Sequence, residues 1–134
     1  MKDFHFDAIA AFENYDIKKM RDGHVIVTTK VVDSSLNYYG NAHGGYLFTL
    51  CDQISGLVVI SQGVDGVTLQ SSINYLKAGR LGDVLTIHGE CVHSGRTTRV
   101  VDVDITNQDG ANVCKATFTM FVTGERDESA QVRI

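Results

Sequence analysis

The chain has 134 residues, which is enough for one domain with a sizeable core and too few for two substantial domains. Its formal net charge of -4 repels polyanions, so nucleic acid is not an expected partner. Charges interrupt the N-terminal residues where a signal peptide needs an apolar stretch, and no apolar run reaches the roughly 18 residues of a membrane span, so we expect a cytoplasmic protein with no membrane partner.

The N-terminal part of the chain predicts one short helix and one strand. Residues 3–13 place apolar side chains at mixed helical spacing, and Asp3 is available as an N-cap, so we expect a helix there. After a turn signal at residues 21–23, residues 24–32 are dense in β-branched side chains, which pack well on a pleated surface. This segment is the first predicted strand.

Residues 42–60 change to a helical period. Apolar side chains recur at the i, i+3, i+4 and i+7 positions of one stripe, and further apolar residues lie off that stripe. We therefore expect a central helix of about five turns that is buried on several sides. The stripe consists of Leu47, Leu50, Cys51, Ile54, Leu57 and Val58.

Four extended segments follow the helix and predict an antiparallel sheet. Glycine and Asn or Asp at the intervening turns supply the positive-φ positions that hairpins need. Alternating side chains give the strands one apolar face, and the simplest connection is an antiparallel meander. We predict an α+β fold, with one antiparallel sheet wrapped around one long helix, as a single domain over residues 1–134. The four segments are residues 67–76, 84–93, 97–106 and 112–122.

One carboxylate lies within the predicted central helix. Desolvating a carboxylate is costly unless it is paired or its pKa rises, so Asp52 is a candidate catalytic residue, with a structural ion pair as the alternative. On a helical wheel Asp52 lies about 140° from Leu47, beside Phe48 and Val59. It therefore faces away from its own sheet, and an interface between subunits explains this mixture of polar and apolar neighbours.

His43, Gly44 and Gly45 lie where the central helix is predicted to begin. Backbone N–H groups at a helix N-terminus have no intrahelical partner, and the helix dipole adds partial positive charge there. Two glycines let a substrate carbonyl approach the backbone closely, so the segment is a candidate oxyanion site worth about 3 kcal/mol of barrier per donor. The alternative is that the glycines only permit a tight entry into the helix.

The spacing of Gly44 and Asp52 predicts a shared site. Eight residues of helix separate them, which corresponds to about 12 Å, too far for both to touch one reacting carbon. Two antiparallel helices related by a two-fold axis would bring Gly44 of one chain near Asp52 of the other. We therefore expect a homodimer with two equivalent sites.

A longer pattern runs through the start of the helix and the turns of the sheet. Its members are Asn37, Gly40, His43, Gly44, Gly45, Leu50 and Asp52, followed by the segments 75–77, 82–83 and 94–98. This pattern resembles the signature of acyl-CoA thioesterases of the phenylacetate-degradation type, in the 4-hydroxybenzoyl-CoA thioesterase superfamily. The resemblance implies a hotdog fold and the hydrolysis of acyl-CoA thioesters.

The resemblance also implies a role for each matching residue. Asp52 would act as general base or nucleophile on the thioester, and the Gly44 N–H would polarise its carbonyl. Asn37 would position the substrate or the attacking water, and His43 would brace the loop by hydrogen bonding. Thr68 lies where some relatives carry a hydroxyl that helps to orient the water.

The coenzyme A part of the substrate would meet a different turn. Gly95, Arg96 and Thr97 would approach the nucleotide and pantetheine, with the arginine supplying charge for phosphate. Gly45 is expected beside the substrate at the helix mouth. No separate cofactor is implied, because coenzyme A enters as part of the substrate. The expected partners are acyl-CoA and further copies of the chain, in a dimer and, by resemblance, a dimer of dimers.

Two other functions remain open. A hotdog hydratase or dehydratase would act on the same thioesters, but it resembles a different motif with a catalytic histidine ahead of a proline, and this chain has no proline. A non-catalytic acyl-CoA binding module would use Asp52 only for a hydrogen bond at an interface. Turnover of an acyl-CoA separates this module from an enzyme.

The histidines of one predicted strand and the cysteine beside Asp52 are not expected to form functional sites. His88 and His93 lie five positions apart on a predicted strand, without Cys-x-x-Cys or His-x-x-x-His spacing, so we expect no metal site. Cys51 lies on the core stripe and is expected to be inert packing.

Overall fold

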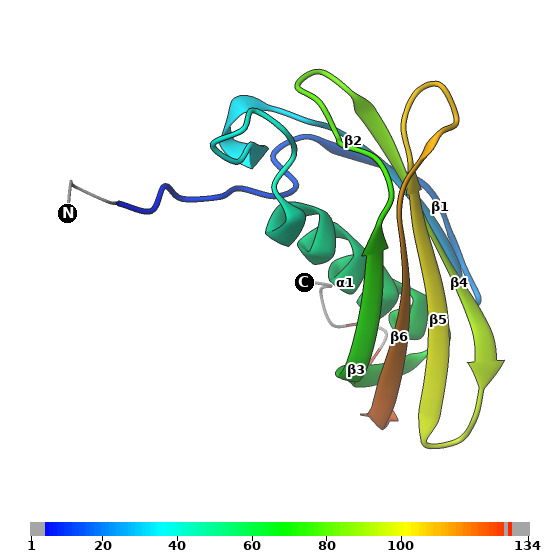
Figure 1. The fold of residues 1–134 in the computed structure, drawn as a ribbon. Coiled ribbons are helices and arrows are strands. Elements are labelled where there is room, and N and C mark those ends of the chain that lie inside the picture. The colour runs from blue at the N-terminus through cyan, green and yellow to red at the C-terminus, as the bar shows by residue number, and fades with distance from the viewer. Residues whose placement is uncertain (1–4, 128, 130–134) are drawn as a thin grey trace.

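A single long helix lies across the inner face of a curved antiparallel sheet (Figure 1). The computed structural model describes residues 5–127 and 129. The helix, α1, spans Gly44–Ile60, so it begins slightly later than predicted. The predicted α+β architecture is confirmed. The remaining elements are β1 (Tyr15–Arg21), β2 (His24–Lys30), the 3-10 helix η1 (Asp33–Ser35), β3 (Val64–Tyr75), β4 (Val84–Ser94), β5 (Thr98–Thr106) and β6 (Asn112–Glu125).

The strand order in the sheet is β1-β2-β4-β5-β6-β3. The predicted meander is therefore wrong in one respect: β4, β5 and β6 follow one another, but β3 does not lie beside β4. The chain leaves α1 and enters the sheet at its far edge, where β3 pairs with β6 and Ser71 lies opposite Phe118. Turn residues indicate hairpins between neighbours in sequence, whereas the β3–β6 pairing depends on long-range contacts.

The N-terminal segment differs from its prediction. Residues 5–13 contain no helix and run as an extended segment (Figure 1), while Asp3 lies outside the described residues. The predicted helix over residues 3–13 is therefore wrong over the part that the structure describes. A short helix is marginal in water unless its apolar face is packed, and here Phe6 is fully exposed.

The strand β1 was not predicted, although the turn at residues 21–23 that joins it to β2 was. β1 is an edge strand, and its pairing with β2 shifts register between Ile17 and Lys19. A bulge of this kind places an extra residue in one strand, so apolar side chains do not alternate strictly. The period that identifies the other strands is therefore missing from β1.

The hydrophobic core lies between α1 and the inner face of the sheet. The alternation predicted for the strands is confirmed in β5, where Val101, Val103 and Ile105 are buried and Asp102 is exposed. The described residues include no helix long and apolar enough to cross a membrane. The largest fully buried side chains include Tyr46, Phe118, Leu50, Ile54, Leu85 and Ile87.

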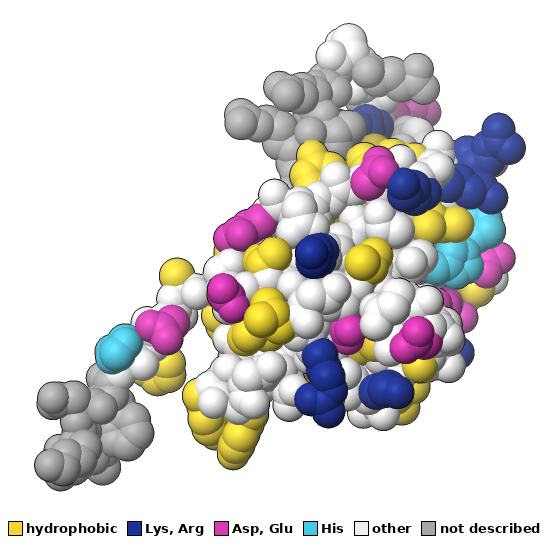
Figure 2. Space-filling model, turned by 90° about the horizontal axis from the view of Figure 1, so that it is seen from above, with side chains coloured by type: hydrophobic (Ala, Val, Ile, Leu, Met, Phe, Trp, Pro, Cys, Tyr) yellow, Lys and Arg dark blue, Asp and Glu magenta, His cyan; other side chains and the backbone are white. Residues whose placement is uncertain are grey.

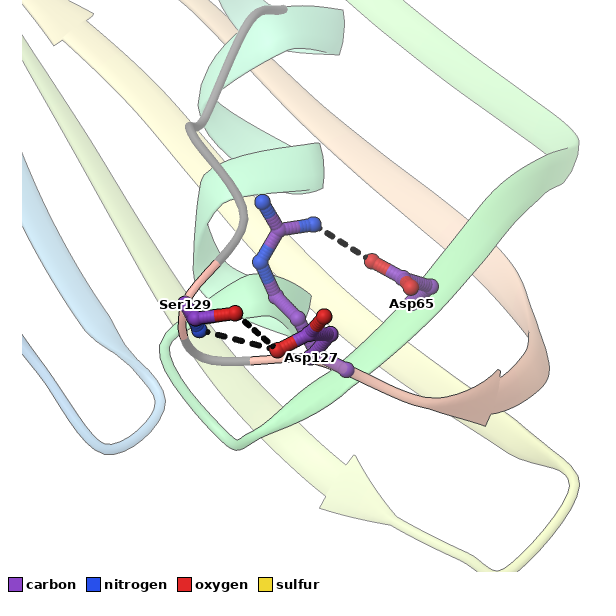
Figure 3. Close-up of polar contacts among 4 residues, drawn as sticks. Asp65, Asp127 and Ser129 are labelled. Atoms are coloured by element: carbon purple, nitrogen blue, oxygen red, sulfur yellow. Dashed lines mark hydrogen bonds and ion pairs between the residues drawn. The ribbon is translucent and has the colours of Figure 1, made fainter.

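Polar contacts join the end of β6 to the start of β3. The Arg126 guanidinium donates to Asp65 Oδ1 at 2.7 Å (Figure 3), and the Arg126 N–H donates to the Gly63 carbonyl at 3.0 Å. Asp127 accepts hydrogen bonds from the Ser129 hydroxyl and N–H, and these bonds lower the pKa of Asp127. The start of β3 is thereby held against β6.

Replacing Gly89 with alanine is expected to destabilise the fold. A Cβ at this position in β4 would lie 2.8 Å from methyl groups of both Ile54 and Val58, so the helix and the sheet would have to separate. Overpacking of this kind typically costs about 1–3 kcal/mol of unfolding free energy. Gly124→Ala in β6 is the matched control, because nothing lies within 4 Å of its added Cβ. Urea unfolding measures both variants, and equal stabilities would contradict the prediction.

Candidate active site

The N-terminus of α1 is built by a histidine cap followed by two glycines. His43 Nδ1 accepts a hydrogen bond from the Gly45 N–H at 2.9 Å, and the His43 carbonyl accepts from the Leu47 N–H at 3.0 Å. This geometry is consistent with the bracing role predicted for His43. The Gly44 N–H donates to none of the described residues, and it lies in the first turn, where the helix dipole is positive. Gly44 is therefore the glycine whose amide can meet a substrate oxygen.

Tyr75, the last residue of β3, holds Gly44 in place; the sequence pattern included this residue but assigned it no role. Its hydroxyl donates to the Gly44 carbonyl at 2.9 Å. Burial raises the pKa of Tyr75, so the phenol stays protonated and remains a donor. A Cβ added to Gly44 would lie 3.4 Å from the Tyr75 ring, so a branched side chain would crowd this contact.

Asp52 lies on a side of α1 that meets β3, so the prediction that it faces away from its own sheet is wrong. The Asp52 side chain is half-buried, whereas a buried carboxylate was expected. Thr68 Oγ1, from β3, donates to Asp52 Oδ1 at 2.9 Å and lies 3.4 Å from Met120 Sδ. The other carboxylate oxygen accepts no hydrogen bond from a described residue. The structure thus brings two of the predicted catalytic residues together, with one carboxylate oxygen held and the other free.

The apolar residues predicted to flank Asp52 have different surroundings. Phe48 is half-buried, and its ring centroid lies 5.6 Å from that of Phe118. Val59 is only 1% exposed and belongs to the core of the single chain. Of the two, only Phe48 is placed to contact a partner or a substrate beside Asp52.

Cys51, next to Asp52 in the chain, faces the core. Its Sγ lies 3.9 Å from Cys114 Sγ, and both side chains are fully buried. The contact with Cys114 and burial raise the pKa of Cys51, so the thiol stays protonated. A protonated, buried thiol is a poor nucleophile, in agreement with the packing role predicted for Cys51.

Asn37 braces the loop that precedes α1. Its Oδ1 accepts hydrogen bonds from the Tyr39 N–H at 3.0 Å and the Asn41 N–H at 3.1 Å, and its backbone N–H donates to the Asn41 carbonyl at 2.8 Å. The sequence predicted that Asn37 positions the substrate or water. Since its oxygen is occupied by the loop, the side-chain amide NH₂ is the group available for that role.

The turn at residues 95–97 lies at the C-terminal end of α1, opposite the end with the two glycines. Arg99 Nε donates to the Gly95 carbonyl at 2.8 Å, and Arg99 Nη1 donates to Gln62 Oε1 at 2.6 Å, just beyond the last turn of the helix. Arg96 is exposed and has no ion-pair partner among the described residues. One chain therefore does not bring this turn to the helix N-terminus.

Within one chain, the candidate residues form two separate groups. A pocket of about 360 Å³ at the helix N-terminus is lined by Gly44, Leu47 and Tyr75 among others, but not by Asp52. Gly44 and Asp52 both lie in α1, so about 12 Å of helix separates them. Asp52 and Thr68 thus form one half of a site, and the pocket at the helix N-terminus forms the other.

A family model, Thioesterase superfamily, matches residues 39–114. This chain belongs to the thioesterase superfamily. The acyl-coenzyme A thioesterase PaaI of Escherichia coli is 36% identical to it over 107 residues, which cover 80% of this chain and 76% of that protein. The E. coli PaaI structure superposes with a TM-score of 0.80 at 33% identity, covering 83% of this chain and 80% of that one. The predicted hotdog fold, the enzyme class and the resemblance to phenylacetate-degradation thioesterases are confirmed.

Two similar streptococcal proteins have been solved with coenzyme A or acetyl-CoA. A hypothetical thioesterase from Streptococcus pneumoniae, solved with coenzyme A, is 86% identical, with a TM-score of 0.91, and covers 92% of this chain and 100% of that chain. The protein smu.793 from Streptococcus mutans, bound to acetyl CoA, is 69% identical, with a TM-score of 0.85 and the same coverages. The pneumococcal protein has also been solved as its Asp52→Ala and Thr68→Ala variants.

Replacing Thr68 with valine is expected to lower thioester turnover by about tenfold or more. Valine keeps the shape of threonine but removes the hydroxyl that donates to Asp52, and a hydrogen bond to a charged group contributes about 1.5–3 kcal/mol. Thr68→Ser retains the hydroxyl and is expected to keep most of the activity. Steady-state kinetics of the two variants tests this, and equal losses in both would assign Thr68 a packing role instead.

Proposed function

We propose that this superfamily member hydrolyses acyl-CoA thioesters to the free acid and coenzyme A. The observation that carries the proposal is the Asp52 carboxylate, which is held through Oδ1 by the Thr68 hydroxyl and leaves its second oxygen without a partner among the described residues. A fixed carboxylate of this kind is suited to activate water or to attack a thioester carbonyl. The acyl-coenzyme A thioesterase activity in the name of the E. coli relative supports the choice of substrate.

The proposed chemistry transfers the acyl group to water. With Asp52 as general base, the carboxylate takes a proton from water as the oxygen attacks the thioester carbon, and the C–S bond then breaks to release coenzyme A, with the thiolate taking up a proton. With Asp52 as nucleophile, a mixed anhydride forms first and water then hydrolyses it. In either case the Gly44 N–H stabilises the oxyanion, and the Asn37 amide orients the substrate or water. His43 keeps the loop and the helix N-terminus in place.

The proposed site is shared by two chains. The pocket at the helix N-terminus lacks Asp52, and about 12 Å of helix separates Gly44 from Asp52 in the same chain. Two antiparallel α1 helices across a two-fold axis place Gly44 of one chain beside Asp52 of the other. The homodimer then contains two equivalent sites.

The edge strand β3 is the proposed dimer surface. Val67 and Leu69, on either side of Thr68, are 53% and 59% exposed, and Phe121 of the neighbouring strand β6 is 41% exposed. Exposed apolar side chains on an edge strand indicate a surface that another chain covers. Because Thr68 contacts Asp52, a chain packed here would lie beside the catalytic carboxylate. We further predict that two such dimers assemble into a dimer of dimers. Sedimentation measures the mass of this assembly.

The coenzyme A part of the substrate is proposed to extend toward the turn at residues 95–97. Arg96 is exposed and can pair with phosphate, and the Gly95 carbonyl is held by the Arg99 side chain, which keeps the turn in shape. Gly45 leaves space for the substrate beside the oxyanion donor. Since this turn and the helix N-terminus lie at opposite ends of α1 in one chain, the dimer would also bring them together.

A hydrolysis screen tests the proposed function. Acetyl-, medium-chain, phenylacetyl- and hydroxybenzoyl-CoA are supplied with a thiol reagent, and at least one is expected to release free coenzyme A in proportion to the enzyme. Binding of these thioesters without release of thiol would instead indicate the non-catalytic module. Hydration of an enoyl-CoA without thiol release would indicate the hydratase.

A further inference from the structure

Two histidines and a glutamate meet on the outer face of the sheet, away from the candidate active site. His24 begins β2, and His88 and Glu90 lie in β4, with His24 directly opposite Glu90 in the register. The intervening Gly89 faces α1, since a Cβ there would touch the helix, so its neighbours in β4 face the other way. Histidine side chains gather at one edge of the molecule in Figure 2, with acidic side chains beside them.

The ligand atoms of the three side chains converge on one point. The two Nε2 atoms, of His24 and His88, lie 2.5 Å apart, and the potential ligand atoms of the two histidines and Glu90 all lie within 4.8 Å of one another. At this separation both Nε2 atoms cannot carry a proton, so at least one presents its lone pair to the space between the rings. A tetrahedral zinc ion bonded at about 2.0–2.1 Å to each nitrogen would hold them about 3.3 Å apart, so the rings need to separate by less than about 1 Å.

A second carboxylate lies near Nδ1, the other ring nitrogen of His88. Asp104, on the neighbouring strand β5, lies opposite His88 in the register, and its Oδ2 lies 3.7 Å from His88 Nδ1. A histidine that binds a metal through Nε2 usually donates its Nδ1–H to a carboxylate or carbonyl, which sets its tautomer and orientation. At 3.7 Å the Asp104 carboxylate is just beyond hydrogen-bond distance, so it needs to approach by about 0.5 Å or more to act in this way on His88.

We propose that His24, His88 and Glu90 form a binding site for one divalent transition-metal ion of the zinc type, with Asp104 as a positioning residue for His88. Two imidazoles and one carboxylate are a donor set that suits zinc and leave a fourth position open for water. The three ligands come from two paired strands, so the ion would cross-link β2 to β4. The expectation of no metal site considered His88 only with His93, whereas its partner in the sheet is His24, 64 residues away.

Zinc binding by the untagged, chelator-treated full chain tests the proposal. Isothermal titration with Zn²⁺ is expected to give one ion per chain, and Co²⁺ is expected to give the visible absorption of a tetrahedral complex. His24→Gln and His88→Gln are each expected to lower the Zn²⁺ affinity by about a hundredfold or more, and Asp104→Asn by about ten- to a hundredfold. His93→Gln is the matched control, because His93 is an exposed histidine on the same strand, and it is expected to bind as the wild type does.

The folded state of each variant is checked by circular dichroism and by its urea unfolding midpoint. Glu90→Gln provides a second test that does not depend on the histidine variants, because Glu90 is exposed and its replacement does not disturb packing; its Zn²⁺ affinity is expected to fall by about tenfold or more. A wild-type chain that binds no Zn²⁺ would overturn the proposal and leave only a hydrogen bond between the two rings. Ligand variants that bind Zn²⁺ as tightly as His93→Gln would overturn it as well.

Discussion

The Asp52→Asn variant is expected to lose at least about a hundredfold in kcat for acyl-CoA hydrolysis while keeping its fold, since removal of a general base or nucleophile typically costs this much or more. Asparagine matches the shape of aspartate and retains an oxygen that can accept the Thr68 hydroxyl, so the local structure is preserved. Because the side chain is only half-buried, loss of the charge leaves no isolated polar group in the core. Steady-state kinetics with the acyl-CoA that the wild type hydrolyses fastest measures the effect.

A control variant that removes one negative charge elsewhere distinguishes the loss of the catalytic group from a general effect of the lost charge. Asp109 is exposed at the turn between β5 and β6, and Asp109→Asn removes the same charge far from the proposed site. This control is expected to hydrolyse thioesters at the wild-type rate. If Asp52→Asn keeps more than about a tenth of the wild-type turnover, Asp52 is neither the base nor the nucleophile.

Mixed dimers of two inactive variants are expected to recover activity. Gly44→Val places a branched side chain against the Tyr75 ring and in the path of the substrate carbonyl, while Asp52→Asn removes the base. Only one of the two sites in a mixed dimer combines an intact Gly44 with an intact Asp52. Random mixing of equal amounts makes half of the dimers mixed, so about a quarter of the wild-type activity should return.

The mixing experiment requires dimers that have exchanged subunits. Native mass spectrometry verifies the mixed species, and sizing of Gly44→Val alone shows whether this variant still dimerises. Gly44→Ala serves as a milder partner, because its Cβ would lie 3.4 Å from the Tyr75 ring, an ordinary contact. Verified mixed dimers with no more activity than either parent would show that Gly44 and Asp52 do not serve one thioester between chains.

The sequence by itself determined the elements whose signals are local. The apolar stripe predicted α1 to within a turn, because a helical period is set by residues three and four apart. Alternation predicted the buried faces of β5 and β6, whereas β1, where the register shifts after Ile17, was not predicted. The candidate catalytic residues were found in the same way, since Asp52 and the two glycines are unusual in an otherwise apolar helix, and together with Asn37 they carried the resemblance to the thioesterases.

Only the tertiary structure decided which distant residues meet. It placed β3 beside β6, put the Thr68 hydroxyl on Asp52, brought the Tyr75 hydroxyl to the Gly44 carbonyl, and set His24 against His88. These partners are 16, 31 and 64 residues apart for the three side-chain contacts. Their meeting depends on the register of paired strands and on how α1 crosses the sheet. Register and helix packing are set by the burial of the whole core, so no short stretch of sequence contains them.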